Sequence, residues 1–151
     1  MINEKLEPLK LHVEHQIQLA KDTTCPIILE QLSNSKYDQA CHHVAKNKHT
    51  SVETLTKLFD NKVCLNVLSQ NPNTPPDILI KLADGKDSYI RNENISKNPS
   101  SPASALYIVY LKCLESIKCG KWKELYNNVV LPALENHQNC DERIWLLKAL
   151  L

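Results

Sequence analysis

Residues 70–82 read QNPNTPPDILIKL, and this stretch decides the fold. Two asparagines and three prolines fall within residues 71–76, directly before an amphipathic apolar run. The cluster is either a linker between domains or a turn that the chain uses repeatedly. The same pattern recurs elsewhere in the chain: an apolar residue, then Ala or Ser, then Lys or Gln, then Asp or Asn. The Asp or Asn positions are Asp22, Asn47, Asn71 and Asn98.

The spacing of these four positions indicates a repeat. They are separated by 25, 24 and 27 residues. Self-similarity at such a period is typical of stacked helical units that bury their apolar stripes against their neighbours. We therefore expect an all-α solenoid built from short helix pairs, and the quoted stretch is a turn inside it, not a linker.

The local chemistry of the stretch agrees with a helix stop followed by a helix start. Pro72 disfavours the α conformation at Asn71, so the preceding helix ends there. Thr74 is expected to cap the next helix, and Pro75 to occupy its first position, where a missing N–H costs nothing. Leu79 and Leu82 then mark the buried face. The corresponding N-caps elsewhere are Thr24, Thr50 and Ser101.

A single domain is expected over residues 1–151. Residues 1–18 form an N-terminal capping helix, residues 19–109 form about four repeats, and residues 110–151 form C-terminal capping helices. Breaks are expected near Gly120 and around residues 137–140, and Pro132 is expected to divide the middle helix of this last segment.

Residues 71–99 resemble the variant leucine-rich repeat, a family related in architecture to HEAT and armadillo solenoids, and the resemblance extends over residues 19–109. The residues that carry it are Asn71, Pro72, Thr74, Pro75, Leu79, Leu82, Ile90, Arg91, Ser96, Asn98 and Pro99. It implies a right-handed superhelix. Some proteins with these repeats carry an iron–sulfur cluster in a separate cysteine-rich N-terminal segment, which this sequence does not match.

Composition and motifs exclude several functions. Eighteen Lys and Arg balance 17 Asp and Glu, so the strong basic field of a nucleic-acid binder is absent. Only two glycines occur, which argues against a Gly-rich phosphate loop. Neither a signal peptide nor an 18-residue apolar run is present, so a cytoplasmic, non-membrane protein is expected. The six cysteines are expected to be buried thiols, since none forms a CxxC pair.

Candidate sites for chemistry are weak. The Cys41-His42-His43 run cannot place all three side chains on one ion, because adjacent helical residues point about 100° apart. The acidic residues are interleaved with lysines, and no nucleophile–base pair is evident. We therefore expect no enzyme activity, cofactor or metal site.

A solenoid of this kind is expected to bind a protein, as a monomer, through its second helices. The candidate partner-binding residues are Tyr37, His42, Asn66, Tyr89, Arg91, Asn92 and Trp122. One specific hypothesis is a small bacterial immunity protein that neutralises a toxin by occluding its active site. An adaptor role is the more general version. The alternative from another class is nucleic-acid binding, through Lys112, Lys118, Lys121, Trp122 and Lys123.

Overall fold

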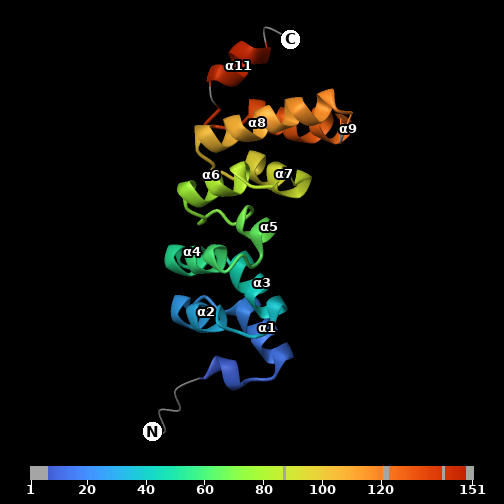
Figure 1. Ribbon diagram of the computed structural model, residues 1–151. Coiled ribbons are helices and arrows are strands. Elements are labelled where there is room, and N and C mark those ends of the chain that lie inside the picture. The colour runs from blue at the N-terminus through green and yellow to red at the C-terminus, as the bar shows by residue number, and fades with distance from the viewer. Residues whose placement is uncertain (1–6, 87, 121–122, 141, 149–151) are drawn as a thin grey trace. The chain divides into compact units, whose positions relative to one another are not determined.

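The computed structural model describes residues 7–86, 88–120, 123–140 and 142–148. The residues within these ranges form helices and turns, with no strand among them, so the expected all-helical class is confirmed (Figure 1). The chain divides into two compact units, Met1–Asn73 and Thr74–Leu151. Each unit is described by itself.

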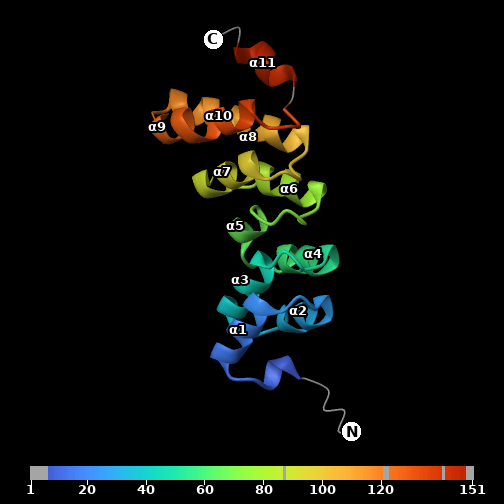
Figure 2. The same ribbon diagram turned by 180° about the vertical axis from the view of Figure 1, so that it is seen from behind.

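Unit 1 contains a short 3₁₀ turn and five α-helices. In chain order these are η1 (Pro8–Lys10), α1 (Val13–Asp22), α2 (Pro26–Leu32), α3 (Asp38–Lys46), α4 (Val52–Asp60) and α5 (Leu65–Leu68). Helix α3 contacts all of the other α-helices of the unit, including α1 before it and α5 after it (Figures 1 and 2). The core between them is aliphatic and has no solvent exposure at Leu29, Leu32, Val44, Leu55 and Leu58.

Unit 2 contains a longer central helix. In chain order its elements are α6 (Pro76–Asp84), α7 (Tyr89–Lys97), α8 (Ala103–Lys118), α9 (Lys123–Leu125), the π-helical turn η2 (Tyr126–Val130), α10 (Leu131–Glu135) and α11 (Glu142–Lys148). Helix α8 packs on α6 and α7, and α10 covers α7 and α8 (Figure 2). The fully buried core of unit 2 includes Leu79, Ile95, Leu106, Val109, Tyr126, Leu134 and Ile144.

The asparagines of the repeated turns are buried and connect one turn to the turn before it. Asn47 Nδ2 donates to the carbonyl oxygens of Ala20 and Thr23, each at 2.9 Å. Asn71 Nδ2 donates in the same way to Ala45, at 2.7 Å, and to Asn47, at 3.1 Å. These bonds satisfy carbonyl groups that the preceding helix leaves without intrahelical partners. The asparagine therefore ends its own helix and also fixes the previous turn.

The helices after these turns begin one residue later than the sequence predicts. Ser51, not Thr50, caps α4, and its hydroxyl accepts the Thr54 N–H at 3.2 Å. Thr50 Oγ1 instead donates to the Val44 carbonyl, at 2.6 Å, and closes the turn. Pro75 is likewise the N-cap of α6, and the first helical position belongs to Pro76. At the start of α4, the neighbouring Thr50 and Ser51 have the same capping ability, so the sequence alone allows either register. At the start of α6, either Pro75 or Pro76 can occupy the first helical position.

Helix α5 is much shorter than the helix expected after residue 60. Lys62 and Cys64 have positive φ angles of 56° and 58°, so the backbone is left-handed at two positions before α5. The N–H of Lys62 donates to Phe59 O at 2.9 Å, and that of Val63 to Leu58 O at 3.0 Å. This pattern is a Schellman motif with lysine at the position that favours glycine. It delays the start of the second helix until Leu65.

The two ends of the repeat region also differ from expectation. A 3₁₀ turn at Pro8 precedes α1, so the N-terminal helix begins only at Val13. At the other end, α8 continues without a break through residues 109 and 110, where the sequence pattern places the end of the repeats. The expected division at Pro132 is not seen: residues 123–135 stay helical without a gap, and the π-helical turn η2 leads directly into α10, which contains Pro132. Within the described ranges, none of the helices has both the length and the apolarity needed to cross a membrane.

Candidate partner-binding surface

A groove in unit 1 lies where α1 and α3 pack together. Helix α1 contributes Ile17 and Lys21, and helix α3 contributes side chains from its first two turns. The groove has a volume of about 550 Å³, and its lining residues are Ile17, Lys21, Asp38, Gln39, His42, His43 and Cys64. The helical spacing of four residues explains why Asp38 and His42, and also Gln39 and His43, occur together.

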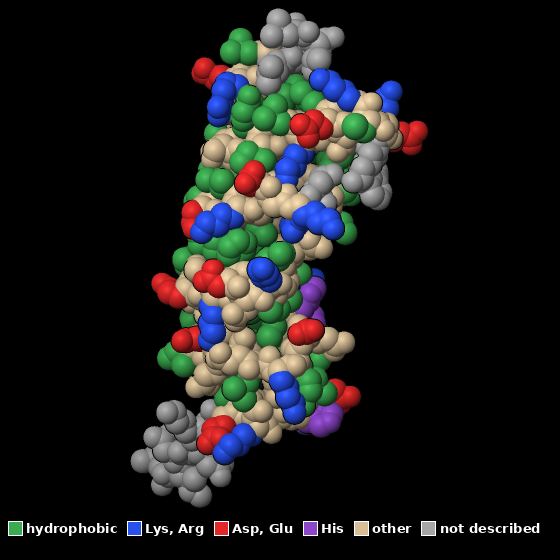
Figure 3. All heavy atoms as spheres, in the orientation of Figure 1, with side chains coloured by type: hydrophobic (Ala, Val, Ile, Leu, Met, Phe, Trp, Pro, Cys, Tyr) green, Lys and Arg blue, Asp and Glu red, His purple; other side chains and the backbone are tan. Residues whose placement is uncertain are grey.

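A smaller hollow of about 280 Å³ shares two residues with this groove. Lys21 and His43 line both, and Lys46 and Asn47 extend the smaller one toward the end of α3. Lys21 and Lys46 are exposed, as is His42, whereas His43 is half-buried. The surface in this region therefore offers two ammonium groups and an imidazole beside the Asp38 carboxylate. Histidine side chains are visible at the surface in the lower part of Figure 3, over unit 1.

The two histidines of the groove pack against each other, and the surroundings of His43 lower its pKa. Their rings meet edge to face, with centroids 5.3 Å apart. Burial lowers the pKa of His43, and the nearby positive charges of Lys21, His42 and Lys46 lower it further. His43 is therefore neutral at neutral pH, and can both donate and accept a hydrogen bond from a bound group.

The thiols near the groove are unreactive. Burial raises the pKa of the Cys64 thiol to about 11, and Cys41 and Asp38 contribute to the rise. Burial and Asp38 also raise the pKa of Cys41. The nucleophilic form of cysteine is the thiolate, so neither residue is activated for covalent catalysis. Cys41 is instead a buried donor, with Sγ 3.4 Å from the Ser35 carbonyl oxygen.

The structure brings only some of the predicted partner-binding residues together. His42 lies in the groove. Tyr37 is the N-cap residue of α3, half-buried, with Lys36 Nζ 5.1 Å above its ring. Asn66 is an exposed residue of α5, in the same unit. Lys21 was missed because it joins His42 only when α1 packs against α3. Asp38, Gln39 and His43 lie beside His42 on α3 at helical spacing, but the sequence did not single them out as partner-binding residues.

In unit 2, the predicted residues that the structure describes contact other residues of the same unit. Asn92 is 1 % exposed, and its Nδ2 donates to the Tyr126 hydroxyl at 2.9 Å. It is a core residue, which corrects the expectation that it faces a partner. Tyr89 packs edge to face on Tyr126, with centroids 5.6 Å apart, and Arg91 donates to the Lys86 carbonyl. Trp122 lies outside the described residues.

One residue of the nucleic-acid alternative has an internal role. Lys112 Nζ donates to the carbonyl oxygens of Ala83, at 2.5 Å, and Gly85, so its ammonium group caps the C-terminal end of α6. A lysine held in this way is not placed for phosphate contacts. Lys121 and Trp122 lie outside the described residues, and the exposed Lys118 and Lys123 remain.

Two further observations concern this surface. In the part of the chain that the structure describes, no group of three His, Cys, Asp or Glu side chains is arranged to hold a metal ion. Comparisons with protein-family models, curated proteins and solved structures find no match to this chain. The interpretation of the surface therefore rests on its own residues.

Proposed function

We propose that this chain is a non-enzymatic, protein-binding α-solenoid of the variant leucine-rich repeat kind, and that its second helices bind the partner. The observation that carries the proposal is the groove between α1 and α3, both of which end at a repeated Asp or Asn position. Its exposed lining residues, among them Lys21, Asp38 and His42, do not belong to the apolar core.

The turns and the helix faces of unit 1 have separate roles, and this separation supports the proposed function. The buried asparagines Asn47 and Asn71 hold successive turns of unit 1 together through backbone carbonyls, whatever the side chains on the helix faces. Exposed groove residues can then vary without loss of the repeat frame, which is how solenoids acquire different partners. Catalysis has less support, because the pKa values of the Cys41 and Cys64 thiols near the groove are raised, so the nucleophilic thiolate form is disfavoured at both.

The charges of the groove indicate the chemistry of its partner. Lys21, Lys46 and His42 can donate to carboxylates, and Asp38 can accept from one lysine or arginine. A partner segment with two or more acidic side chains beside one basic side chain complements this arrangement. A bacterial immunity protein, which covers the active site of a toxin in the cytoplasm, is one specific form of the proposed function. An adaptor in a larger assembly is the other form.

The experiment compares two charge-matched variants as baits in quantitative affinity purification with mass spectrometry. Lys21→Glu/Lys46→Glu, the groove variant, reverses the charge of one residue of the groove and of one residue of the adjoining hollow. Lys48→Glu/Lys62→Glu makes the same change at two exposed turn residues that do not line the groove. We expect a protein recovered with wild type to fall at least about tenfold with the groove variant alone, because like charges are placed against its carboxylates.

Three outcomes would overturn the proposal: no protein enriched over an unrelated bait, equal loss with both variants, or recovery that depends on nucleic acid. The immunity form is tested separately. Expression of the chain should protect cells from a toxin encoded by a neighbouring reading frame, and the groove variant should not protect them. If the chain did not protect the cells, the immunity form would be wrong and the adaptor form would remain.

A further inference from the structure

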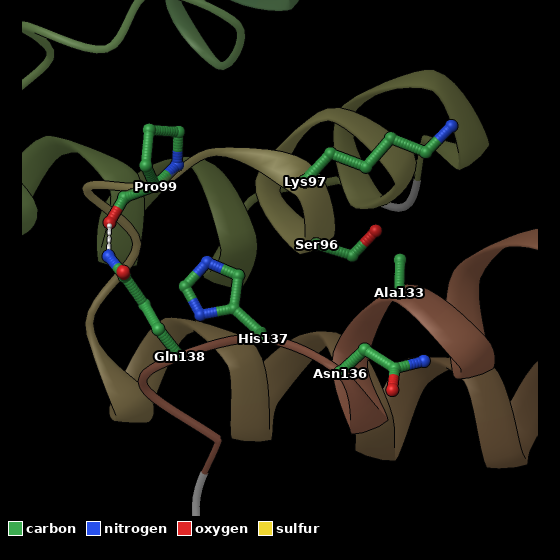
Figure 4. Close-up of a pocket in the computed structure, with 7 residues that line it drawn as sticks. All are labelled: Ser96, Lys97, Pro99, Ala133, Asn136, His137 and Gln138. Carbon is green, nitrogen blue, oxygen red and sulfur yellow. Dashed lines mark hydrogen bonds between the residues drawn. The ribbon is translucent and has the colours of Figure 1, made fainter.

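Each unit has a hollow at the place where the ends of two packed helices meet. In unit 1 the helices are α1 and α3, and the hollow of about 280 Å³ is lined by Lys21, His43, Lys46 and Asn47. In unit 2 the helices are α7 and α10, and the volume is about 420 Å³. The lining residues of this second hollow are Ser96, Lys97, Pro99, Ala133, Asn136, His137 and Gln138 (Figure 4).

The turn after α10 makes the two hollows equivalent, because His137 forms the hydrogen bonds of the asparagine turns. In the turns at Asn47, Asn71 and Asn98, the side-chain oxygen accepts the N–H two residues later at 2.9 Å. His137 Nδ1 accepts the Asn139 N–H in the same way, at 3.0 Å. His137 Nε2 also lies 2.8 Å from the Asn98 carbonyl oxygen, in the preceding turn of unit 2. Asn71 reaches the Asn47 carbonyl oxygen correspondingly, at 3.1 Å.

The lining residues of the two hollows occupy the same positions relative to these turns. One lysine in each hollow, Lys21 or Lys97, lies one residue before the turn that ends the first helix. The second helix contributes the residues four positions and one position before its turn. These are His43 and Lys46 in unit 1, and Ala133 and Asn136 in unit 2. The two hollows can therefore be compared position by position.

The hollow of unit 2 carries little charge. Its lysine is paired, with Lys97 Nζ 2.6 Å from Glu93 Oε1. In Figure 4 the side chain of Lys97 extends away from His137. Ala133 and Asn136 are uncharged, so this hollow offers no unpaired ammonium group among the residues that the structure describes.

The hollow of unit 1 instead holds two ammonium groups. Lys21 and Lys46 are exposed, and neither forms an ion pair with any residue within the described ranges. Asp38 lines the adjoining groove but not this hollow. The carboxylate of Asp22, next to Lys21 in the chain, accepts a hydrogen bond from Gln18 Nε2 at 2.5 Å.

We propose that the hollow of unit 1 binds a phosphate monoester, carried by a phosphoserine or phosphothreonine side chain of the protein partner; this inference rests on the proposed function. A phosphorylated side chain brings a charge of about −1.5 to −2 and three acceptor oxygens at neutral pH. The hollow offers donors to match, namely the ammonium groups of Lys21 and Lys46 and the imidazole N–H of His43. A carboxylate brings a single negative charge, which leaves one ammonium group unmatched.

The electrostatics of His43 agree with an anionic ligand. Burial lowers the pKa of His43, and the positive charges of Lys21, His42 and Lys46 lower it further. A bound dianion would offset these charges. Phosphate binding should therefore raise the pKa of His43, and this change gives the experiment a second readout at the site itself.

The test is two-dimensional nitrogen-15 NMR on the full chain at pH 7.5, with two capped pentapeptides as probes. Their central residue is phosphoserine in one and glutamate in the other, and the remaining residues are alanine. The phosphoserine peptide should shift the resonances of residues 43–47 and raise the pKa of His43. It should also bind at least about fivefold more tightly than the glutamate peptide.

Two double variants with the same change of charge provide the control. Lys21→Gln/Lys46→Gln should weaken phosphoserine binding at least about tenfold, because it removes both ammonium groups. Lys97→Gln/Lys118→Gln, which includes the equivalent lysine of unit 2, should change the affinity by less than about twofold. All four lysines lie in the last turn of a helix, so both variants lose the same kind of helix-dipole interaction. Only a bound phosphate distinguishes them.

Several results would contradict the proposal: no shift at residues 43–47 up to about 5 mM phosphoserine peptide, equal affinity for the two peptides, or equal weakening by both variants. A short single-stranded oligonucleotide is a third probe, and tighter binding of it at Lys21 and Lys46 would assign the hollow to nucleic acid. The proposed function fails separately. If a partner is still recovered through Lys21 and Lys46 after phosphatase treatment of the lysate, the partner stands and the phosphate is wrong. If the phosphoserine peptide binds but no partner is recovered, the phosphate site stands and the proposed function is wrong.

Discussion

The side-chain amide of Asn71 donates to the carbonyl oxygen of Ala45, 26 residues earlier, at 2.7 Å. The same nitrogen donates to Asn47 O at 3.1 Å, and the side-chain oxygen accepts the Asn73 N–H at 2.9 Å. Asn71 is only 2 % exposed, so water does not replace these bonds when they are lost. The residue that looks in sequence like a helix stop is thus also a long-range connection within unit 1.

Asn71→Asp tests this role with almost no change in shape. A carboxylate cannot donate, and it places a negative charge against two carbonyl oxygens in a buried site. We expect a loss of about 2–4 kcal/mol in the free energy of unfolding, measured by urea denaturation at pH 7.5. Asn127→Asp, at an exposed position, is the control and should change stability by less than about 0.5 kcal/mol. An equally small effect at residue 71 would show that the amide donors are dispensable.

Ser51→Ala tests the position of the cap on α4. Removing the hydroxyl that accepts the Thr54 N–H should lower the free energy of unfolding by about 1 kcal/mol. A hydrogen bond from its own backbone N–H lowers the pKa of Glu53, and Ser51 lowers it further. The pKa of Glu53 should therefore rise in Ser51→Ala, as followed by NMR of the carboxyl carbon during a pH titration.

The sign of the accompanying pH effect follows from linkage. The pKa of Glu53 is lower in the folded chain, so its contribution to stability is present above the unfolded pKa. That contribution is lost as the pH falls through the folded pKa. The wild type should thus lose more stability than Ser51→Ala on acidification. Thr50→Val is the control: it removes the bond to Val44 but should leave the Glu53 titration unchanged. If Thr50→Val changed the Glu53 titration and Ser51→Ala did not, Thr50 would be the N-cap of α4.

The cysteines should differ widely in their reaction with iodoacetamide. Burial raises the pKa of Cys64 to about 11, so at pH 8 only a very small fraction is thiolate. Cys119 is exposed, whereas Cys41 and Cys113 are buried. We expect Cys119 to be alkylated at least about tenfold faster than Cys64, as measured by peptide mass spectrometry over time. Comparable rates would show that the groove around Cys64 opens readily, and urea should equalise the rates in any case.

The sequence was informative about features that depend on local chemistry. The period of the asparagine turns and the helix breaks follow from neighbouring residues, and the structure confirms helices on both sides of these turns. Cap positions were wrong by one residue where two suitable residues are adjacent, as at Thr50 and Ser51. Lys62 and Cys64 adopt left-handed conformations without glycine, so nothing in their residue types predicted the short α5.

Features that depend on long-range packing were harder to predict from the sequence. Asn92 has the polar character of a surface residue, and only the approach of Tyr126 from a distant segment buries it. His42 was identified as a candidate, but Lys21 joins it only when α1 packs on α3. The break around residues 137–140 was expected from the sequence, and the structure has a turn there, but the likeness of its hydrogen bonds to those of the asparagine turns was not expected, for two reasons. His137 follows Asn98 by 39 residues, beyond the period of the other turns, and histidine replaces the expected amide.

Substitutions in opposite directions at Lys62 and Gly120, each at the end of a helix, test whether a positive φ angle strains a residue that carries a side chain. Both residues follow a helix directly after its C-cap, and both have positive φ angles, 56° for Lys62 and 72° for Gly120. A side chain is strained in this conformation, whereas glycine is not. Lys62→Gly should therefore stabilise the chain by about 0.5–1 kcal/mol, and Gly120→Ala should destabilise it by about 1 kcal/mol.

The surroundings make these two substitutions suitable for comparison. A Cβ at Gly120 would meet no atom within 4 Å among the described residues, so the cost of alanine is conformational and not a clash. Lys62 is exposed, and its replacement removes little packing. Lys62→Ala is the control, since it removes the charge and side chain but keeps the Cβ, and it should not stabilise. Urea denaturation of the three variants measures the effects. If Lys62→Ala stabilised as much as Lys62→Gly, charge and not backbone strain would be the cause.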